Sequence, residues 1–175
     1  MQPIRVRDAN ADDLPDMLAI YNEVVANSTA IYSFQPSTLD ERREWFRVRS
    51  GGGWPVLAAV RGDELLGYAS FAEFRGAWPG YLHSVEHSVY VRADCRQQGV
   101  GRALVQALLP IAAAMDKHVM IGGIDAANEA SLRLHERLGF ERVAHFREVG
   151  RKFDRWLDLV FVQRFIDAPG AARAG

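Results

Sequence analysis

The sequence has little cysteine, little net charge and no long apolar run. Cys95 is the single cysteine among 175 residues, so an internal disulfide and a cysteine-rich metal site are excluded. Lys and Arg number 21 against 22 Asp and Glu, a net charge of −1, so the chain lacks the basic surface that nucleic acid or an anionic membrane requires. No apolar run approaches the roughly 20 residues of a membrane helix. The start, Met1 to Arg5, lacks the apolar core of a signal peptide. We therefore expect a reduced, cytoplasmic protein that binds neither nucleic acid nor membranes.

The rest of the composition is typical of a folded globular protein. The chain is 49% hydrophobic and 25% charged, which disfavours disorder, and its length suits one domain with a sizeable core. We predict a single domain over residues 1–167. The last residues, 168–175, are mostly small, which predicts a flexible tail.

Hydrophobic periodicity predicts an alternation of hairpins and helices. The clearest start signal is the capping box Thr38–Glu41, and Gly139 is placed to end a helix. Strands are predicted over residues 4–7, 55–60, 65–72, 82–91, 119–124, 141–149 and 155–165, and helices over residues 13–25, 38–49, 99–115 and 128–138. This order indicates an α/β (α+β) fold with a mixed sheet.

Residues 27–36 form a predicted loop with unusual aromatic content. It contains Ile31, Tyr32 and Phe34. Two interpretations are open: the loop packs its own aromatic side chains, or it forms a flap over a small substrate that Phe34 contacts.

A glycine-containing turn joins the predicted strand 82–91 to the helix that follows. Residues 96–103 read Arg-Gln-Gln-Gly-Val-Gly-Arg-Ala. The start of a helix offers free N–H groups and a partial positive charge, and glycine lets a ligand approach the backbone, so this turn suits a pyrophosphate. A bare Gly-x-Gly also occurs in purely structural turns. No Gly-Lys-Ser/Thr follows and the third glycine of the dinucleotide fingerprint is missing, which excludes both of those phosphate motifs.

Two separated motifs resemble the GNAT superfamily of N-acetyltransferases. Residues 96–101 resemble its acyl-CoA pyrophosphate loop, and residues 128–140, from Asn128 to Phe140, resemble the segment that flanks the pantetheine arm. Within the superfamily, residues 85–91 and 152–158 are similar to the phosphinothricin and methionine sulfoximine N-acetyltransferases. The resemblance covers roughly residues 4 to 166.

This resemblance implies a fold, a cosubstrate and a binding site. The implied fold is a mixed, mostly antiparallel sheet that splays at its central strand and is flanked by helices on both faces, with acetyl-CoA entering at the splay. The implied acetyl-CoA contacts are Val89, Tyr90 and Val91 for the pantetheine and acetyl portions, Gln97, Gln98, Gly99, Val100, Gly101 and Arg102 for the pyrophosphate, and Asn128 for the CoA arm.

The resemblance also implies an amino-acid site. Its implied lining is Arg75, Gly76 and Ala77 together with Glu86, His87 and Ser88. The loop from Phe74 to Tyr81 departs from the family pattern, and Leu82 stands where close relatives often carry arginine. The contact with the substrate carboxylate, and therefore the acceptor, stays open at this point.

Acetyl transfer requires a base, because the substrate amine arrives as an ammonium ion. Glu86 is the first candidate, since its strand is otherwise apolar or small and partial burial would raise the pKa of its carboxyl group. The alternative is a carboxylate held in an ion pair with an arginine. Tyr90 shares one strand face with Glu86 and Ser88. His135, seven residues after Asn128, is either a catalytic group near the departing thiolate or a packing histidine.

Two other kinds of site, a cysteine nucleophile and a metal site, are disfavoured. A Cys95–His87 nucleophile lacks a third, orienting group. A metal site built from His83, Glu86 and His87 is unfavourable because adjacent strand residues point to opposite faces. We predict no metal.

The predicted function is acetyl-CoA-dependent acetylation of the α-amine of a small amino acid or analogue, such as L-methionine sulfoximine, methionine sulfone or phosphinothricin. The alternatives are a non-catalytic acyl-CoA-binding regulatory module and an acetyltransferase for another small amine, a peptide or an antibiotic. The resemblance further implies a homodimer, which exposed apolar residues on the last strands, Trp156 and Phe161, would fit.

Overall fold

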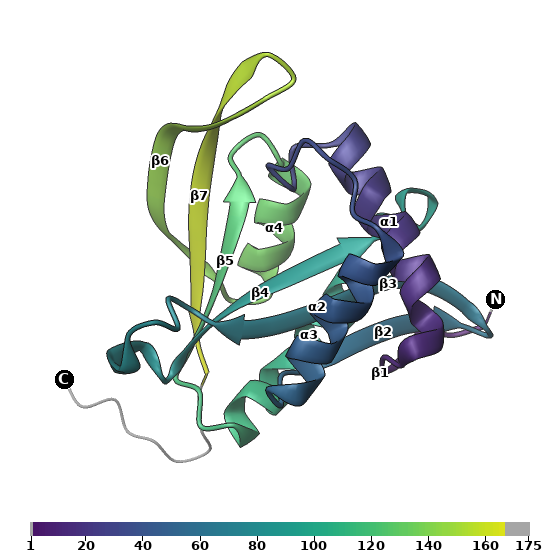
Figure 1. Cartoon of the computed structure of the whole chain (residues 1–175). Coiled ribbons are helices and arrows are strands. Elements are labelled where there is room, and N and C mark those ends of the chain that lie inside the picture. Colours follow the sequence, from purple (N-terminus) through teal and green to yellow (C-terminus); the bar gives the residue numbers. More distant parts are fainter. Residues whose placement is uncertain (1, 167–175) are drawn as a thin grey trace.

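The computed structural model describes residues 2–166 and consists of one mixed sheet with helices packed against it (Figure 1). The strands are β1 (Arg5–Asp8), β2 (Val56–Arg61), β3 (Glu64–Glu73), β4 (Ser84–Val91), β5 (Val119–Asp125), β6 (Glu141–Lys152) and β7 (Arg155–Phe165), and the α-helices are α1 (Leu14–Asn27), α2 (Leu39–Gly51), α3 (Val100–Ala114) and α4 (Glu129–Arg137). The predicted tail, 168–175, lies outside the described residues.

The strand order is β1-β2-β3-β4-β5-β7-β6, and every neighbouring pair is antiparallel except β4 with β5. The parallel pair is short: residues Ser84 to Glu86 pair with Val119 to Ile121, after which the two strands diverge (Figure 1). Residues 87–91 therefore pair with β3 on one edge and leave the other edge of the backbone open. The predicted splay is confirmed, and it lies between β4 and β5.

Helices cover both faces of the sheet, as predicted, because the strand residues alternate. In β2, Leu57 and Ala59 belong to the core under α3 and α4, whereas Val56, Ala58 and Val60 belong to the core under α1 and α2. We call these the α3/α4 face and the α1/α2 face. All five residues are buried, so β2 has a core on each side.

Local capping signals were reliable guides to the helix starts. The Thr38 hydroxyl accepts a hydrogen bond from the Glu41 backbone N–H at 3.2 Å, and the Glu41 carboxylate accepts one from the Thr38 N–H at 2.7 Å, which is the predicted capping box. Asn10 caps the short 3-10 turn that leads into α1. Both devices involve neighbours in sequence, so a short sequence window contains the whole interaction.

Two predictions about the later strands need correction. The strand predicted from Leu82 begins at Ser84, because Leu82 closes the 3-10 turn Pro79–Tyr81 and is 62% exposed. Phe161 was expected to be exposed, but its ring packs against Phe74 and Phe146, with centroids 6.4 and 5.8 Å away, and it is partly buried. Trp156 is 61% exposed, as expected. Among the described residues, no helix combines the length and apolarity needed to cross a membrane.

Candidate active site

Strand β4 presents different chemistry on its two faces. Glu86, Ser88 and Tyr90 stand opposite Ala72, Ser70 and Tyr68 of β3, and Tyr68 lies in the core of the α1/α2 face. His87 alternates with them and therefore faces α3 and α4. Of the predicted site residues on β4, the structure groups Glu86, Ser88 and Tyr90 and separates them from His87.

The Glu86 carboxylate lies at the open side of the splay without a bonded partner. Its Oε1 is 3.5 Å from where a Cβ on Gly123 would be, and the Phe161 ring approaches the same point. The residue is exposed by surface area, yet the protein around it removes enough water to raise the pKa of the carboxyl group, and the positive charge of Arg49 opposes that rise. Within residues 2–166 the Glu86 carboxylate oxygens form no hydrogen bond and no ion pair, so the alternative of a carboxylate held by an arginine does not describe this site.

Tyr90 continues the same face toward the end of β4. Its ring meets Tyr21 of α1 edge-on at 6.0 Å between centroids and packs on Tyr68 at 5.2 Å. Burial raises the pKa of the Tyr90 hydroxyl, so the phenol remains protonated near neutral pH and can donate a hydrogen bond.

The turn between β4 and α3 has the features of an anion site. Gly99 adopts a left-handed conformation, with φ of +87°, directly before the helix. The N–H groups of residues 100–102 precede the first intrahelical bond, from Ala103 to Gly99, and point out of the helix start. The Gln98 side chain supports the turn by donating to the Asp94 carbonyl at 2.8 Å.

Asn128 begins α4 on the other side of the splay. Its Oδ1 accepts a hydrogen bond from the Ser131 N–H at 3.2 Å, and within the described chain its side-chain NH₂ has no partner. Leu134 of α4 packs close to Gly101, 3.2 Å from where a Cβ would be, which brings α4 against the start of α3. An open strand edge, free N–H groups and a free amide thus border the splay, and this combination fits a long ligand with a pyrophosphate and amide groups such as acetyl-CoA.

His135 does not join Glu86, because it is buried on the α3/α4 face. The Nε2 atoms of His135 and His87 are 2.9 Å apart, and Nδ1 of His87 donates to the Ile121 carbonyl at 2.8 Å. A Cβ on Gly122 would come within 2.7 Å of the His87 ring, so this glycine makes room for the pair. Burial lowers the pKa of both rings, that of His87 to about 3, because it favours the neutral form of each imidazole.

The predicted substrate loop lies next to the Glu86 side of the sheet. Phe74, at its start, packs on Phe161, which borders Glu86. Arg75 is exposed, has a φ of +52° and stacks over the Tyr81 ring at 5.4 Å. Gly76 has no room for a side chain, because the Glu73 carboxylate occupies that space. Ala77 follows in the same exposed loop.

The aromatic loop 28–38 is anchored by Lys152, which is not among the predicted site residues. Nζ of Lys152 donates to the carbonyls of Val25, Ser28 and Ile31 at 2.6, 2.7 and 2.7 Å. The Tyr32 hydroxyl in this loop donates to the Asp158 carbonyl at 3.1 Å. The loop is therefore fastened to β6 and β7, while Phe34 remains 70% exposed.

Arg49 was also missed, although a sequence signal existed. Arg42, Trp45 and Arg49 recur at helical spacing on α2 and face the sheet. Arg49 donates to the Ser70 hydroxyl at 3.2 Å and its charge acts on Glu86 and Tyr90. The sequence analysis predicts only a helix over residues 38–49 that begins at the capping box Thr38–Glu41.

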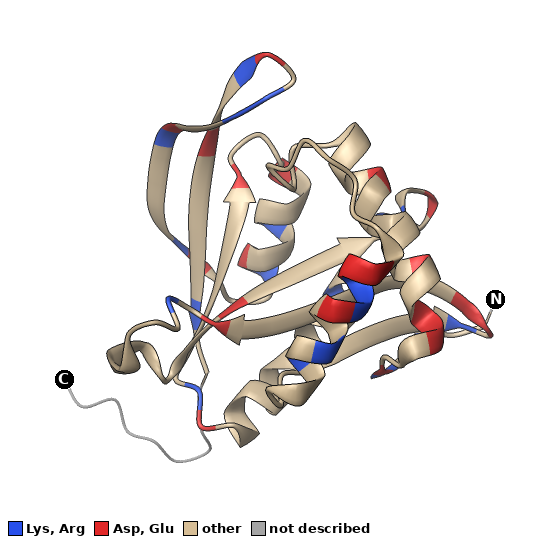
Figure 2. Cartoon of the chain, in the orientation of Figure 1, with Lys and Arg blue, Asp and Glu red and all other residues tan. Residues whose placement is uncertain are grey.

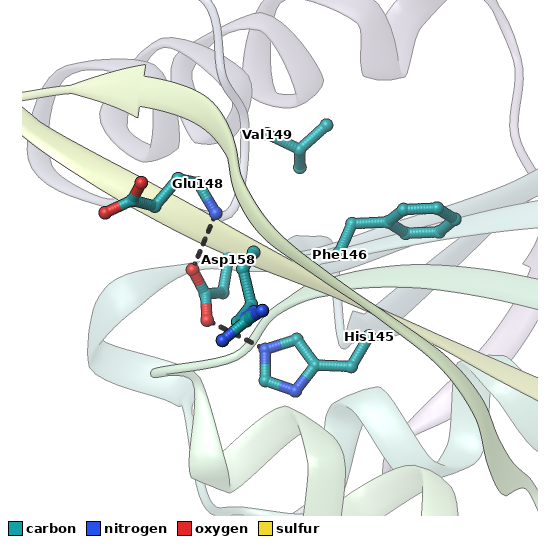
Figure 3. Close-up of a pocket in the computed structure, with 6 residues that line it drawn as sticks. His145, Phe146, Glu148, Val149 and Asp158 are labelled. Carbon is teal, nitrogen blue, oxygen red and sulfur yellow. Dashed lines mark hydrogen bonds and ion pairs between the residues drawn. The ribbon is translucent and has the colours of Figure 1, made fainter.

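A hollow of about 730 Å³ lies on the β6–β7 hairpin (Figure 3). It is lined by His145, Phe146, Arg147, Glu148, Val149 and Asp158. Both Asp158 oxygens are engaged, one with His145 Nε2 at 2.8 Å and one with the Glu148 N–H at 2.8 Å. Glu148 has a φ of +52° within a register shift of β6, so Asp158 stabilises a β-bulge there. Within residues 2–166 there is no cluster of three or more His, Cys, Asp or Glu that could hold a metal ion.

Known proteins that are similar to this chain in sequence and fold are acetyltransferases. The Acetyltransferase (GNAT) family matches residues 17–140. The L-methionine sulfoximine/L-methionine sulfone acetyltransferase of Pseudomonas aeruginosa is 47% identical over 168 residues, 95% of this chain and 97% of the relative. The L-amino acid N-acyltransferase MnaT of Escherichia coli is 43% identical over 162 residues, 93% and 94% of the two chains. Among solved structures, the phosphinothricin acetyltransferase of Sinorhizobium meliloti in complex with acetyl-CoA superposes with a TM-score of 0.90 at 35% identity, covering 93% of this chain and 88% of that one.

Proposed function

The chain belongs to the GNAT family of acetyltransferases, uses acetyl-CoA and is an N-acetyltransferase, and from this premise we propose that it acetylates the α-amine of a small amino acid or amino-acid analogue. We further propose that Glu86 is the base. The observation that carries the proposal is a partly desolvated carboxylate, free of ion pairs, beside the splay between β4 and β5.

Acetyl-CoA supplies the acetyl group as an activated thioester. We assign its pyrophosphate to the turn Gln97–Arg102, where the free N–H groups lie, and its pantetheine arm to the open edge of Val89 to Val91 and to the Asn128 amide. The support for this assignment is the open strand edge and the left-handed Gly99 at the start of α3. These groups hold the cosubstrate by its backbone-like amides and phosphates, so they need no basic surface.

Glu86 removes the proton that keeps the amine from attacking. Its raised pKa makes the carboxylate a stronger base than an exposed glutamate, and therefore better matched to an ammonium group near neutral pH. Ser88 and Tyr90 lie farther along the same face, and the protonated Tyr90 phenol is a candidate donor for charge that develops during the reaction.

His135 remains a candidate for the group that donates a proton to the departing thiolate, although its surroundings limit this role. Its position on α4 after Asn128 supports the role, but its Nε2 is engaged by His87 and its side chain is almost fully buried. The role we favour for the His87–His135 pair is to hold α4 against β4 and β5, so that the two sides of the acetyl-CoA slot keep their spacing.

The acceptor class follows from the relatives and from the loop beside Glu86. Relatives named for methionine sulfoximine, methionine sulfone and phosphinothricin all act on compounds that carry an α-amine and a carboxylate. The exposed loop of Arg75, Gly76 and Ala77 approaches the Glu86 face through Phe74 and Phe161, which supports its assignment to the amino-acid site. Phe34 would close the site from the anchored loop 28–38.

A substrate panel tests the function. Release of free thiol from acetyl-CoA is measured with L-methionine sulfoximine, methionine sulfone, phosphinothricin, unmodified methionine and a short peptide with a free amino terminus. We expect turnover with the free amino acids and little with the peptide. Binding of CoA without turnover on any amine would instead describe a non-catalytic binding module, and turnover of the peptide alone would overturn the acceptor class.

We also propose that the protein is a homodimer. The support is a set of exposed apolar residues on the β6–β7 hairpin: Val143, Phe146, Val149, Phe153 and Trp156. Figure 1 shows this hairpin extending beyond the body of the sheet. Exposed apolar residues gathered on one hairpin are typical of an interface between protein chains, and a second copy of the same chain would present the same residues in return.

A further inference from the structure

The four arginines of helix α2 lie in two different environments. Arg43 and Arg47 are exposed and pair with Asp40 and Glu44 at 2.9 and 2.6 Å. Arg42 and Arg49 turn toward the sheet on either side of Trp45, with guanidinium carbons 5.0 and 5.5 Å from its ring. Figure 2 shows charges of both signs on this helix. The two inward arginines have no carboxylate within ion-pair distance in the described part of the chain.

Arg49 lies above the same strand face as the proposed base. Its Nη1 donates to the Ser70 hydroxyl at 3.2 Å, and Ser70 is the direct cross-strand neighbour of Ser88. Ser88 follows Glu86 on that face by two residues, about 6.6 Å along the strand. Arg49 therefore stands over the patch next to Glu86 without forming an ion pair with it.

Half-burial of an arginine without an anionic partner is unfavourable. Desolvation lowers the pKa of Arg49, and the fields of Tyr90 and Glu86 only partly compensate. A guanidinium carries five N–H donors in a planar fork, and a single side-chain hydrogen bond, to Ser70, is present among the described residues. Its guanidinium carbon lies 5.5 Å from the centroid of the Trp45 ring, within the range of a cation–π interaction. Arg49 is thus held in place with most of its donors free to meet an anion.

We propose that Arg49 binds the α-carboxylate of the amino-acid substrate while Glu86 faces its α-amine. This inference rests on the proposed function, because it assigns one contact within the same site. The two groups of an α-amino acid sit on one carbon, so an amine at Glu86 brings the carboxylate over Ser88 and within reach of the guanidinium. A planar fork matches a carboxylate with two parallel hydrogen bonds. Arg75, in its exposed loop, is then left for the side-chain end of the substrate.

The experiment pairs a change in the protein with a change in the substrate. Methionine sulfone is compared with 3-(methylsulfonyl)propan-1-amine, the same molecule without its carboxylate, used as substrate or as competitive inhibitor. In Arg49→Met we expect KM for methionine sulfone to rise about 10- to 100-fold with kcat changed only a few-fold. The constant for the amine should not change. Arg49→Lys, which keeps the charge and loses the fork, should fall between the two proteins.

The matched control is Arg47→Met, on the same helix but exposed and paired with Glu44, which should leave both substrates unaffected. Equal losses for the amino acid and the amine in Arg49→Met would mean a structural role and would overturn the proposal. Unchanged kinetics for both would overturn it as well. If Arg49→Met fails to fold, Arg49→Lys decides by the same comparison. Turnover of methionine sulfone by the unchanged protein tests the proposed function separately, so failure of Arg49 and failure of the function give different results.

Discussion

The pKa values of the adjacent residues Glu86 and His87 shift in opposite directions for the same physical reason. Burial favours the neutral form of any titratable group, so it raises the pKa of the Glu86 carboxyl and lowers that of the His87 imidazole. Alternation along β4 sends the carboxylate to the ligand side and the imidazole into the α3/α4 core. One strand therefore carries both the proposed base and a buried histidine.

The histidine pair predicts an acid-sensitive fold. Between about pH 3 and 6.5, the folded value and the ordinary value for His87, the unfolded chain binds more protons than the folded protein, so the free energy of unfolding falls as pH is lowered. In His135→Gln this slope should be shallower by up to about 1.4 kcal/mol per pH unit, because one titrating group is gone. The measurement is urea unfolding at several pH values from 4.5 to 7.

His83→Gln is the control for that slope, since His83 is exposed and bonds only near the surface. Equal slopes in the unchanged protein and His135→Gln would contradict a neutral buried pair. The sequence could name His135 as a candidate but could not pair it with His87, because the two lie 48 residues apart and meet only once α4 packs on the sheet.

At the scale of elements, the turn before α3 depends on one backbone conformation. Gly99 has a φ of +87° and nothing within 4 Å of where a Cβ would be, so conformation alone requires the glycine. Gly99→Ala should strain the start of α3 by about 1 to 2 kcal/mol and raise the Kd of CoA, measured by calorimetry, by about tenfold.

Gly51→Ala is the matched control, because Gly51 also has open space around it and lies at the end of α2, outside the left-handed region. It should leave the Kd of CoA unchanged. An unchanged Kd in Gly99→Ala would remove the turn from the acetyl-CoA site.

The anchored loop is the second element-scale feature. Lys152 uses all three N–H donors on carbonyls at and beyond the end of α1. Lys152→Met leaves those acceptors without a donor, so we expect a loss of about 3 kcal/mol in the free energy of unfolding and faster proteolysis within residues 28–36. Ethylammonium added to Lys152→Ala should restore part of the protection.

Lys117→Met is the control, since Lys117 donates one exposed hydrogen bond, to Leu82, and should change neither property. If Lys152→Met keeps the proteolysis pattern of the unchanged protein, the lysine does not hold the loop. The sequence could not reveal this anchor, because each acceptor is more than 120 residues away from Lys152 and a single charged residue in a strand pattern reads as exposed.

At the scale of the molecule, the exposed hairpin should determine the assembly. Trp156→Glu places a charge on the apolar surface of β6 and β7, where Trp156 is among the most exposed residues, and a buried charge opposes association. We expect the unchanged protein to sediment as a dimer and Trp156→Glu as a monomer at the same micromolar concentration.

Val48→Glu provides the comparison, because Val48 is also apolar and exposed but lies on α2, and this variant should remain dimeric. Sedimentation of the unchanged protein as a monomer would contradict the homodimer. So would a dimer that persists in Trp156→Glu.

The order of elements was predictable because each signal is local. Alternation defined the strands, capping boxes defined helix starts, and the departures at Leu82 and Phe161 arose where a turn or a neighbouring ring overrode the pattern. The splay came from the resemblance, since β4 meets β5 over only three residue pairs, and the strand order was not predicted. Part of the site could be predicted. Glu86 is recognisable in the sequence as a charged residue in an apolar strand, whereas the importance of Arg49 depends on the sheet face that it covers, which only the folded structure shows.

We propose that Glu86 deprotonates the substrate amine, and the pH dependence of kcat/KM for methionine sulfone tests this role. Because the pKa of Glu86 is raised, the rate of the unchanged protein should increase with pH as this carboxyl ionises. Glu86→Gln should lower kcat/KM by about 10²- to 10³-fold and abolish that increase, while Glu141→Gln, an exposed glutamate on β6, should keep both. A Glu86→Gln protein that retains the rate and the pH profile of the unchanged protein would contradict the account.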